Sequence, residues 1–137
     1  MKKTILILIG IFALLGCGGG GGSDQPTIDN LEGTWRGNLN LIADLCDLKV
    51  NPLQEHHEII IAGDKIILVS TDGRTLEGLT MTDDAFEVQI SDEQAFPMID
   101  TIMYELIADG TAQVTVEHVW SRPGGCNTKW VGVMSKD

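Results

Sequence analysis

The chain has 137 residues, enough for one domain of ordinary size and hardly for two. Its 9 Lys and Arg against 20 Asp and Glu give a formal net charge of −11, and hydrophobic residues make up 43% of it. An acidic chain without a basic stripe lacks the clustered cations that neutralise phosphates, which excludes nucleic-acid binding. The composition also excludes a multi-span membrane protein, a collagen-like chain and a largely disordered one.

Residues 1–16 have the pattern of a leader peptide. Lys2 and Lys3 precede an apolar run, residues 5–15, that is too short to cross a bilayer as a helix. The run ends in Leu14-Leu15-Gly16-Cys17, which resembles the lipobox of bacterial lipoproteins. This resemblance implies that residues 1–16 are a signal peptide removed before Cys17, and that the Cys17 thiol receives lipid. The alternative is an ordinary secretory leader with an incidental cysteine.

Residues 17–30 are predicted to link that lipid to the folded domain. Five glycines at 18–22, followed by Ser-Asp-Gln, are typical of a flexible tether. A phosphate-binding loop is excluded because no strand precedes the glycines and no Lys-Ser or Lys-Thr follows them. By resemblance to enteric lipoproteins, Gly18 directly after Cys17 implies the outer membrane of the cell envelope.

Removal of the leader makes the domain more acidic. It leaves 7 basic against 20 acidic side chains, a formal charge of −13. Anionic headgroups repel such a surface, so the N-terminal lipid, and not the surface of the domain, would hold the protein at the membrane.

From residue 31 onward, apolar and polar residues alternate in short segments separated by turn signals such as Asp72-Gly73 and Asp109-Gly110. The pattern predicts eight strands and no amphipathic helix. The predicted strands are 33–42, 57–61, 65–70, 75–81, 85–91, 101–108, 112–121 and 128–134. Eight strands with mostly short connections favour an all-β fold, an antiparallel up-and-down meander that closes into a small barrel and so has no exposed edges. An open β-sandwich is the alternative.

The first predicted strand opens with Gly33-Thr34-Trp35. This segment looks like the Gly-x-Trp opening of lipocalin-like and avidin-like barrels, and the resemblance implies that Trp35 closes the base of a barrel formed by residues 31–137. Lipocalins usually place an Arg near the last strand to stack over that Trp. This chain offers only Lys129 and Lys136 there.

Of the three cysteines, lipidation of Cys17 leaves Cys46 and Cys126 as an even pair in an exported domain, which predicts a disulfide between them. Cys46 follows the first predicted strand and Cys126 precedes the last. In a closed meander these strands are neighbours, so the bond would join the seam of the barrel. The alternative, a Cys-His nucleophile, needs free thiols in an oxidising compartment.

The sequence contains little that indicates catalysis. His56 and His57 are adjacent, so in a strand they point to opposite faces and cannot both bind one metal ion. Glu105 and Glu117 fall on the predicted outer face, where they cannot form a facing pair of buried carboxylates. No Gly-x-Ser-x-Gly and no EF-hand spacing is present. We therefore expect no catalytic residue, no metal site, no cofactor and no enzymatic activity.

His118 is the polar residue whose placement is most informative, because it is in phase with inward-facing Val116 and Trp120. It is either a core histidine with one buried hydrogen bond or, with Trp35 and Tyr104, part of a ligand pocket. Small residues in the same inward phases, Gly37, Gly78 and Gly132, are expected to leave room in the barrel.

Two functions remain open. One is a membrane-anchored barrel that binds a small hydrophobic ligand, such as a fatty acyl chain, without turnover. The other is a protein-interaction module of the cell envelope, an assembly accessory or an inhibitor, with a filled core. An interior cavity of roughly 300 Å³ or more favours the first.

Overall fold

A computed structural model describes residues 27–80, 82, 84–92, 98–120 and 124–137. These residues form a short 3₁₀ turn, η1 (Ile28–Leu31), followed by eight strands. The strands are β1 (Gly33–Asp44), β2 (Leu53–Ala62), β3 (Lys65–Val69), β4 (Thr75–Thr80), β5 (Ala85–Asp92), β6 (Met98–Ala108), β7 (Thr111–Trp120) and β8 (Asn127–Lys136). No helix in this part of the chain is long and apolar enough to span a membrane.

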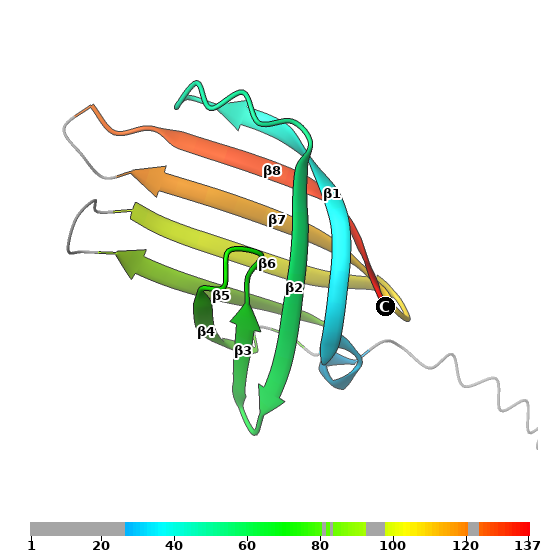
Figure 1. Cartoon of the computed structure of the whole chain (residues 1–137). Coiled ribbons are helices and arrows are strands. Elements are labelled where there is room, and N and C mark those ends of the chain that lie inside the picture. The colour runs from blue at the N-terminus through cyan, green and yellow to red at the C-terminus, as the bar shows by residue number, and fades with distance from the viewer. Residues whose placement is uncertain (1–26, 81, 83, 93–97, 121–123) are drawn as a thin grey trace, which may run out of the picture.

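Each strand pairs antiparallel with the next, and β1 pairs with β8, so the sheet closes into a barrel (Figure 1). The predicted meander and its closure are confirmed, and the open β-sandwich is excluded. Two strands begin earlier than predicted, β2 at Leu53 instead of 57 and β6 at Met98 instead of 101. Both extensions carry an acidic residue in the inward phase, Glu55 and Asp100, where alternation leads one to expect an apolar side chain.

The base of the barrel, the end covered by η1, is filled by large rings. Trp35 is fully buried, and its indole N–H donates a hydrogen bond of 2.7 Å to the carbonyl oxygen of Leu31. The Tyr104 ring stacks on Phe86 with centroids 5.0 Å apart and meets Trp35 edge-on at 5.8 Å. Trp35 therefore closes the base, as the Gly-x-Trp resemblance implies.

The inward glycines do not leave the room that the sequence suggests. A Cβ atom at Gly37 would lie 2.6 Å from the carbonyl oxygen of Val133, and one at Gly132 would lie 2.5 Å from that of Asn38. At Gly78 the added atom would collide with the carbonyl oxygen of Glu87. Neighbouring strands pass so closely at these points that their backbone occupies the space a side chain would need.

The opposite half of the barrel has a notch in its wall, because β3 and β4 are short. The β2–β3 pairing ends at Glu58 and Val69, and the β4–β5 pairing ends at Glu77 and Gln89. Residues 53–57 of β2 and 90–92 of β5 thus have no partner from β3 or β4. The turn at residues 70–74 lies in this notch.

The connection between β1 and β2, residues 45–52, is fixed to the open end of the barrel. A disulfide joins Cys46 to Cys126 with 5.1 Å between the Cα atoms, as the cysteine count predicts. The Leu45 amide donates to the carbonyl oxygen of Asn127 at 2.9 Å, and the Trp130 indole donates to that of Val50 at 2.8 Å. The loop is thereby held against β8 and the residues that precede it.

Candidate ligand cavity

A cavity of about 460 Å³ opens at the notch, and we refer to it as the wall cavity. Its apolar surface comes from β2, β4, β6 and β7, and its polar surface comes mostly from β2 and the turn between β3 and β4. The lining residues are Leu53, Gln54, Glu55, Ser70, Thr71, Asp72, Arg74, Leu76, Asp100, Ile102, Val116 and His118. Because the strands that would complete the wall stop short, the cavity is reached from the side of the barrel.

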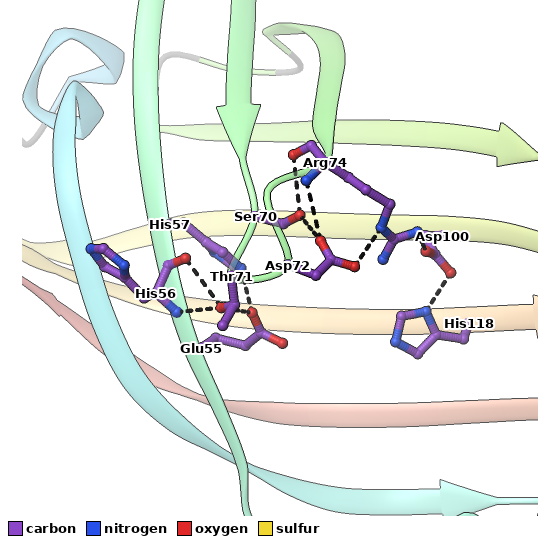
Figure 2. Close-up of polar contacts among 9 residues, drawn as sticks. All are labelled: Glu55, His56, His57, Ser70, Thr71, Asp72, Arg74, Asp100 and His118. Atoms are coloured by element: carbon purple, nitrogen blue, oxygen red, sulfur yellow. Dashed lines mark hydrogen bonds and ion pairs between the residues drawn. The ribbon is translucent and has the colours of Figure 1, made fainter.

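One group of polar residues in the wall cavity is a charged network centred on Asp100. Arg74 Nε donates to Asp72 Oδ2 at 2.6 Å, and an η nitrogen of Arg74 donates to Asp100 Oδ2 (Figure 2). His118 Nδ1 bonds to the other oxygen of Asp100, whose side chain is only 2% exposed. Burial alone would raise the pKa of Asp100. Hydrogen bonds from His118 and Arg74, and their charges, outweigh it and hold that pKa below its ordinary value.

A second polar chain leads from the wall cavity into the base. Glu55 Oε2 lies 2.5 Å from Thr71 Oγ1 and 3.0 Å from His57 Nε2, and His57 Nδ1 lies 2.6 Å from the Tyr104 hydroxyl. Neutral His57 satisfies both contacts if its Nε2–H donates to Glu55 and its Nδ1 accepts from Tyr104. Burial, and with it the charge of Glu55, raises the pKa of Tyr104 well above its usual value, so the phenol stays protonated.

Thr71 accepts a hydrogen bond from β2 at a point where β3 is too short to pair with it. The His56 amide, on the stretch of β2 that β3 does not reach, donates to Thr71 Oγ1 at 2.7 Å (Figure 2). This bond holds the turn at residues 70–74 against the unpaired edge of β2. The Thr71 hydroxyl also donates to Glu55, which holds that carboxylate at the cavity.

A second, apolar cavity of about 290 Å³, the mouth cavity, adjoins the wall cavity. Its lining residues are Leu48, Val50, Leu53, Met98, His118, Trp120 and Trp130. It shares Leu53 and His118 with the wall cavity. The His118 ring meets Trp130 edge-on, with centroids 5.2 Å apart, and lies 5.9 Å from Trp120. The two cavities together form a site with one polar and one apolar part.

A depression of about 570 Å³ lies along β1 and β2 and shares Gln54, Glu55 and Thr71 with the wall cavity. Among the residues that the structure describes, no apolar side chain lines it; the lining residues are Arg36, Gly37, Asn38, Gln54, Glu55, His56 and Thr71. A site that binds a small molecule is mostly apolar with a few polar groups, and the wall and mouth cavities fit that description better.

The three residues predicted to line one pocket are not brought together. Trp35 and Tyr104 pack against each other in the base, and neither lines the wall cavity, whereas His118 does. The reason is steric, because the large rings of Trp35 and Tyr104 fill the base of the barrel, whereas His118 lies in the other half beside the notch. The prediction of a single pocket with all three residues is therefore wrong in its geometry. His118 makes a hydrogen bond to buried Asp100, as expected for the first of the two interpretations given for it.

Sequence reasoning missed Glu55, Arg74 and Asp100. Each is in phase with inward apolar residues, Asp100 with Ile102, Arg74 with Leu76, and Glu55 with buried Ile59. A charged residue in an inward phase was the signal that could have found them. In the described part of the chain, no group of three His, Cys, Asp or Glu side chains is arranged to hold a metal ion. Cys17 and the tether up to residue 26 lie outside the described residues.

No protein-family model matches the sequence, and no curated protein matches it. Among solved structures, the chain is similar to EF1p2_mFAP2b bound to DFHBI. The TM-score is 0.53 and the identity 11%, over 80% of this chain and 95% of that chain. The likeness supports the small β-barrel fold.

Proposed function

We propose that this protein is a membrane-anchored lipoprotein whose barrel binds a small, partly apolar molecule and releases it unchanged. The observation that carries this proposal is the wall cavity, about 460 Å³ in a barrel whose base is filled. Small-molecule sites commonly enclose about 300–1,000 Å³. The solved barrel to which this chain is similar is bound to DFHBI, which supports the use of such a fold for ligand binding.

The contacts of the polar groups favour binding over catalysis. His57 and Tyr104 are buried in the base, and neither lines the wall cavity or the mouth cavity. Among the described lining residues, Ser70 and Thr71 carry hydroxyls, and these bond to Asp72 and Glu55. His118 bonds to Asp100, so it is not paired with a hydroxyl nucleophile in the way that acyl transfer requires.

The anchor is proposed from the lipobox-like segment that ends at Cys17, and the outer membrane from Gly18. Two or three acyl chains hold a protein at a bilayer stably, whereas one chain does so only marginally. Cys17→Ser should yield an unprocessed or unanchored protein in cell fractionation. Normal cleavage and full membrane association of that variant would refute the lipoprotein assignment.

Binding is tested on the mature chain from residue 17 with Cys17→Ser, titrated with a panel of small apolar and amphipathic molecules. Trp130 lines the mouth cavity and Trp35 is sealed in the base, so Trp35→Phe removes a background signal and leaves the reporters near the site. We expect ligand-dependent changes in tryptophan emission and a higher melting temperature.

Val116→Phe provides the matched blocking variant. The Val116 side chain lines the wall cavity, so a larger ring there should abolish binding, whereas Val133→Phe on the exposed outer face of β8 should not affect it. A panel that changes neither emission nor melting temperature would overturn the proposal. The alternative, an interaction module for a protein partner of the cell envelope, would then be the better account.

A further inference from the structure

The charges around the wall cavity are unequal. Among the described lining residues, three carboxylates (Glu55, Asp72 and Asp100) outnumber the Arg74 guanidinium and the His118 imidazole, and both of these groups bond to Asp100. The Glu55 and Asp100 side chains are only 13% and 2% exposed. Charges shielded from water act more strongly on a nearby ligand, so the cavity attracts cations and repels anions.

Arg74 does not reverse this preference. Its guanidinium bonds to Asp72 and to Asp100, so two carboxylates already balance its single charge. An incoming carboxylate or phosphate would have to compete with two acidic groups that the fold itself holds in place. The burial of Asp100 makes that exchange unfavourable.

Glu55 retains capacity to accept hydrogen bonds. Its contacts with Thr71 and His57 both use Oε2, and an ionised carboxylate can accept about four hydrogen bonds over its two oxygens. An ammonium group brings three N–H donors and one positive charge, which makes it the complement of such an acceptor.

The mouth cavity supplies the second half of a binding site. Two tryptophans, Trp120 and Trp130, line it with Leu48, Val50 and Met98, and it meets the wall cavity at Leu53 and His118. A ligand that extends across this junction would place a charged end among carboxylates and an apolar end among aromatic and aliphatic side chains.

On the proposed function, we infer that the ligand is an amphipathic cation, a molecule with an amine-like positive group and an apolar moiety. Glu55 accepts hydrogen bonds from the positive group, and the mouth cavity holds the apolar part.

The test compares three probes with the same eight-carbon chain, octylamine, octanol and octanoate, by calorimetry at neutral pH on the mature chain with Cys17→Ser. We expect octylamine to bind about tenfold or more tightly than octanol, and octanoate to bind most weakly. Glu55→Gln should remove most of the preference for octylamine while leaving octanol binding unchanged. Glu58→Gln, an exposed position on the same strand, serves as the control that removes one negative charge elsewhere.

Glutamine retains the side-chain length of Glu55 and an oxygen for Thr71, and circular dichroism checks that the variant folds. If the Glu55→Gln protein does not fold, Asp72→Asn removes another negative charge from the wall cavity, at a side chain that is 55% exposed. It should weaken octylamine binding several-fold.

Equal affinities, or tighter binding of octanoate, would overturn the inference and leave the ligand-binding function intact. Equal losses in Glu55→Gln and Glu58→Gln would also overturn it, because overall charge and not the cavity would then govern binding. Failure of all three probes and of the wider panel would instead refute the proposed function.

Discussion

The two halves of the barrel follow the same alternation of inward and outward residues but differ in what that alternation encloses. In the base, Trp35, Phe86 and Tyr104 fill the interior, and His57 is the polar residue among them. In the open half, β3 and β4 end early, and Arg74 and His118 both bond to Asp100 beside a cavity. In the described part of the chain, no buried side-chain polar atom lacks a hydrogen-bond partner. The difference therefore lies in strand length and in where polar residues replace apolar ones. One half of the barrel has a packed core, and the other has the cavity to which we assign the proposed ligand binding.

The largest loss of stability should come from removing a large buried side chain from the base. Trp35→Ala removes a fully buried ring and its hydrogen bond to Leu31 and should lower the free energy of unfolding by about 3–5 kcal/mol. Urea denaturation followed by circular dichroism measures this. A loss below about 1 kcal/mol would mean that the base contributes far less to stability than its packing implies.

Removal of the disulfide should lower stability mainly in the open half of the barrel. Replacing Cys46 and Cys126 by Ser opens a cross-link across 80 residues and should cost about 2–4 kcal/mol, mainly through the entropy of the unfolded chain. Hydrogen exchange should show the greatest additional opening at the Leu48 and Lys49 amides, which bond to Asp44 in the loop at the open end. Equal acceleration in the base would contradict the separation of the two halves.

A smaller loss of stability is expected from breaking the contact between Tyr104 and His57 in the base. Tyr104→Phe removes the hydroxyl that lies 2.6 Å from His57 Nδ1, and the buried ring nitrogen is left without this partner. The expected loss is about 1–3 kcal/mol. A double-mutant cycle with His57→Phe isolates the pair, because replacing both partners should cost less than the two single losses combined. Strict additivity would show that the contact contributes nothing of its own.

The smallest effect concerns the charged network of the open half at low pH. The pKa of Asp100 in the folded protein is below its ordinary value of 3.8, so its stabilising contribution is fully present above that pH and is lost as the pH falls through the lowered pKa. Denaturation midpoints should therefore decline below about pH 3.8, and Asp100→Asn should flatten part of that decline. An identical acid profile in the variant would contradict this assignment.

Much of the fold could be predicted because it depends on local patterns. Alternation and two-residue turns such as Asp109-Gly110 predict the strands, and the cysteine count predicts the bond between Cys46 and Cys126. The notch could not be predicted in this way, since the point at which β3 stops pairing with β2 depends on contacts such as that of Thr71 with the His56 amide. The cavity follows from the notch. For this reason Glu55 and Asp100, whose charges interrupt the apolar alternation of two strands, line the wall cavity.

The closure of β8 against β1 brings both ends of the described chain to the base. The Asp137 amide donates to the carbonyl oxygen of Thr34 at 2.9 Å, and Lys136 Nζ donates to that of Asn30 at 3.1 Å. Any attachment through either end, whether a purification tag or the proposed lipid tether, is therefore made at the sealed end of the barrel. On the proposed anchoring, the tether would therefore join the domain at the end opposite the mouth cavity, and its attachment point would leave the entrances of both cavities uncovered.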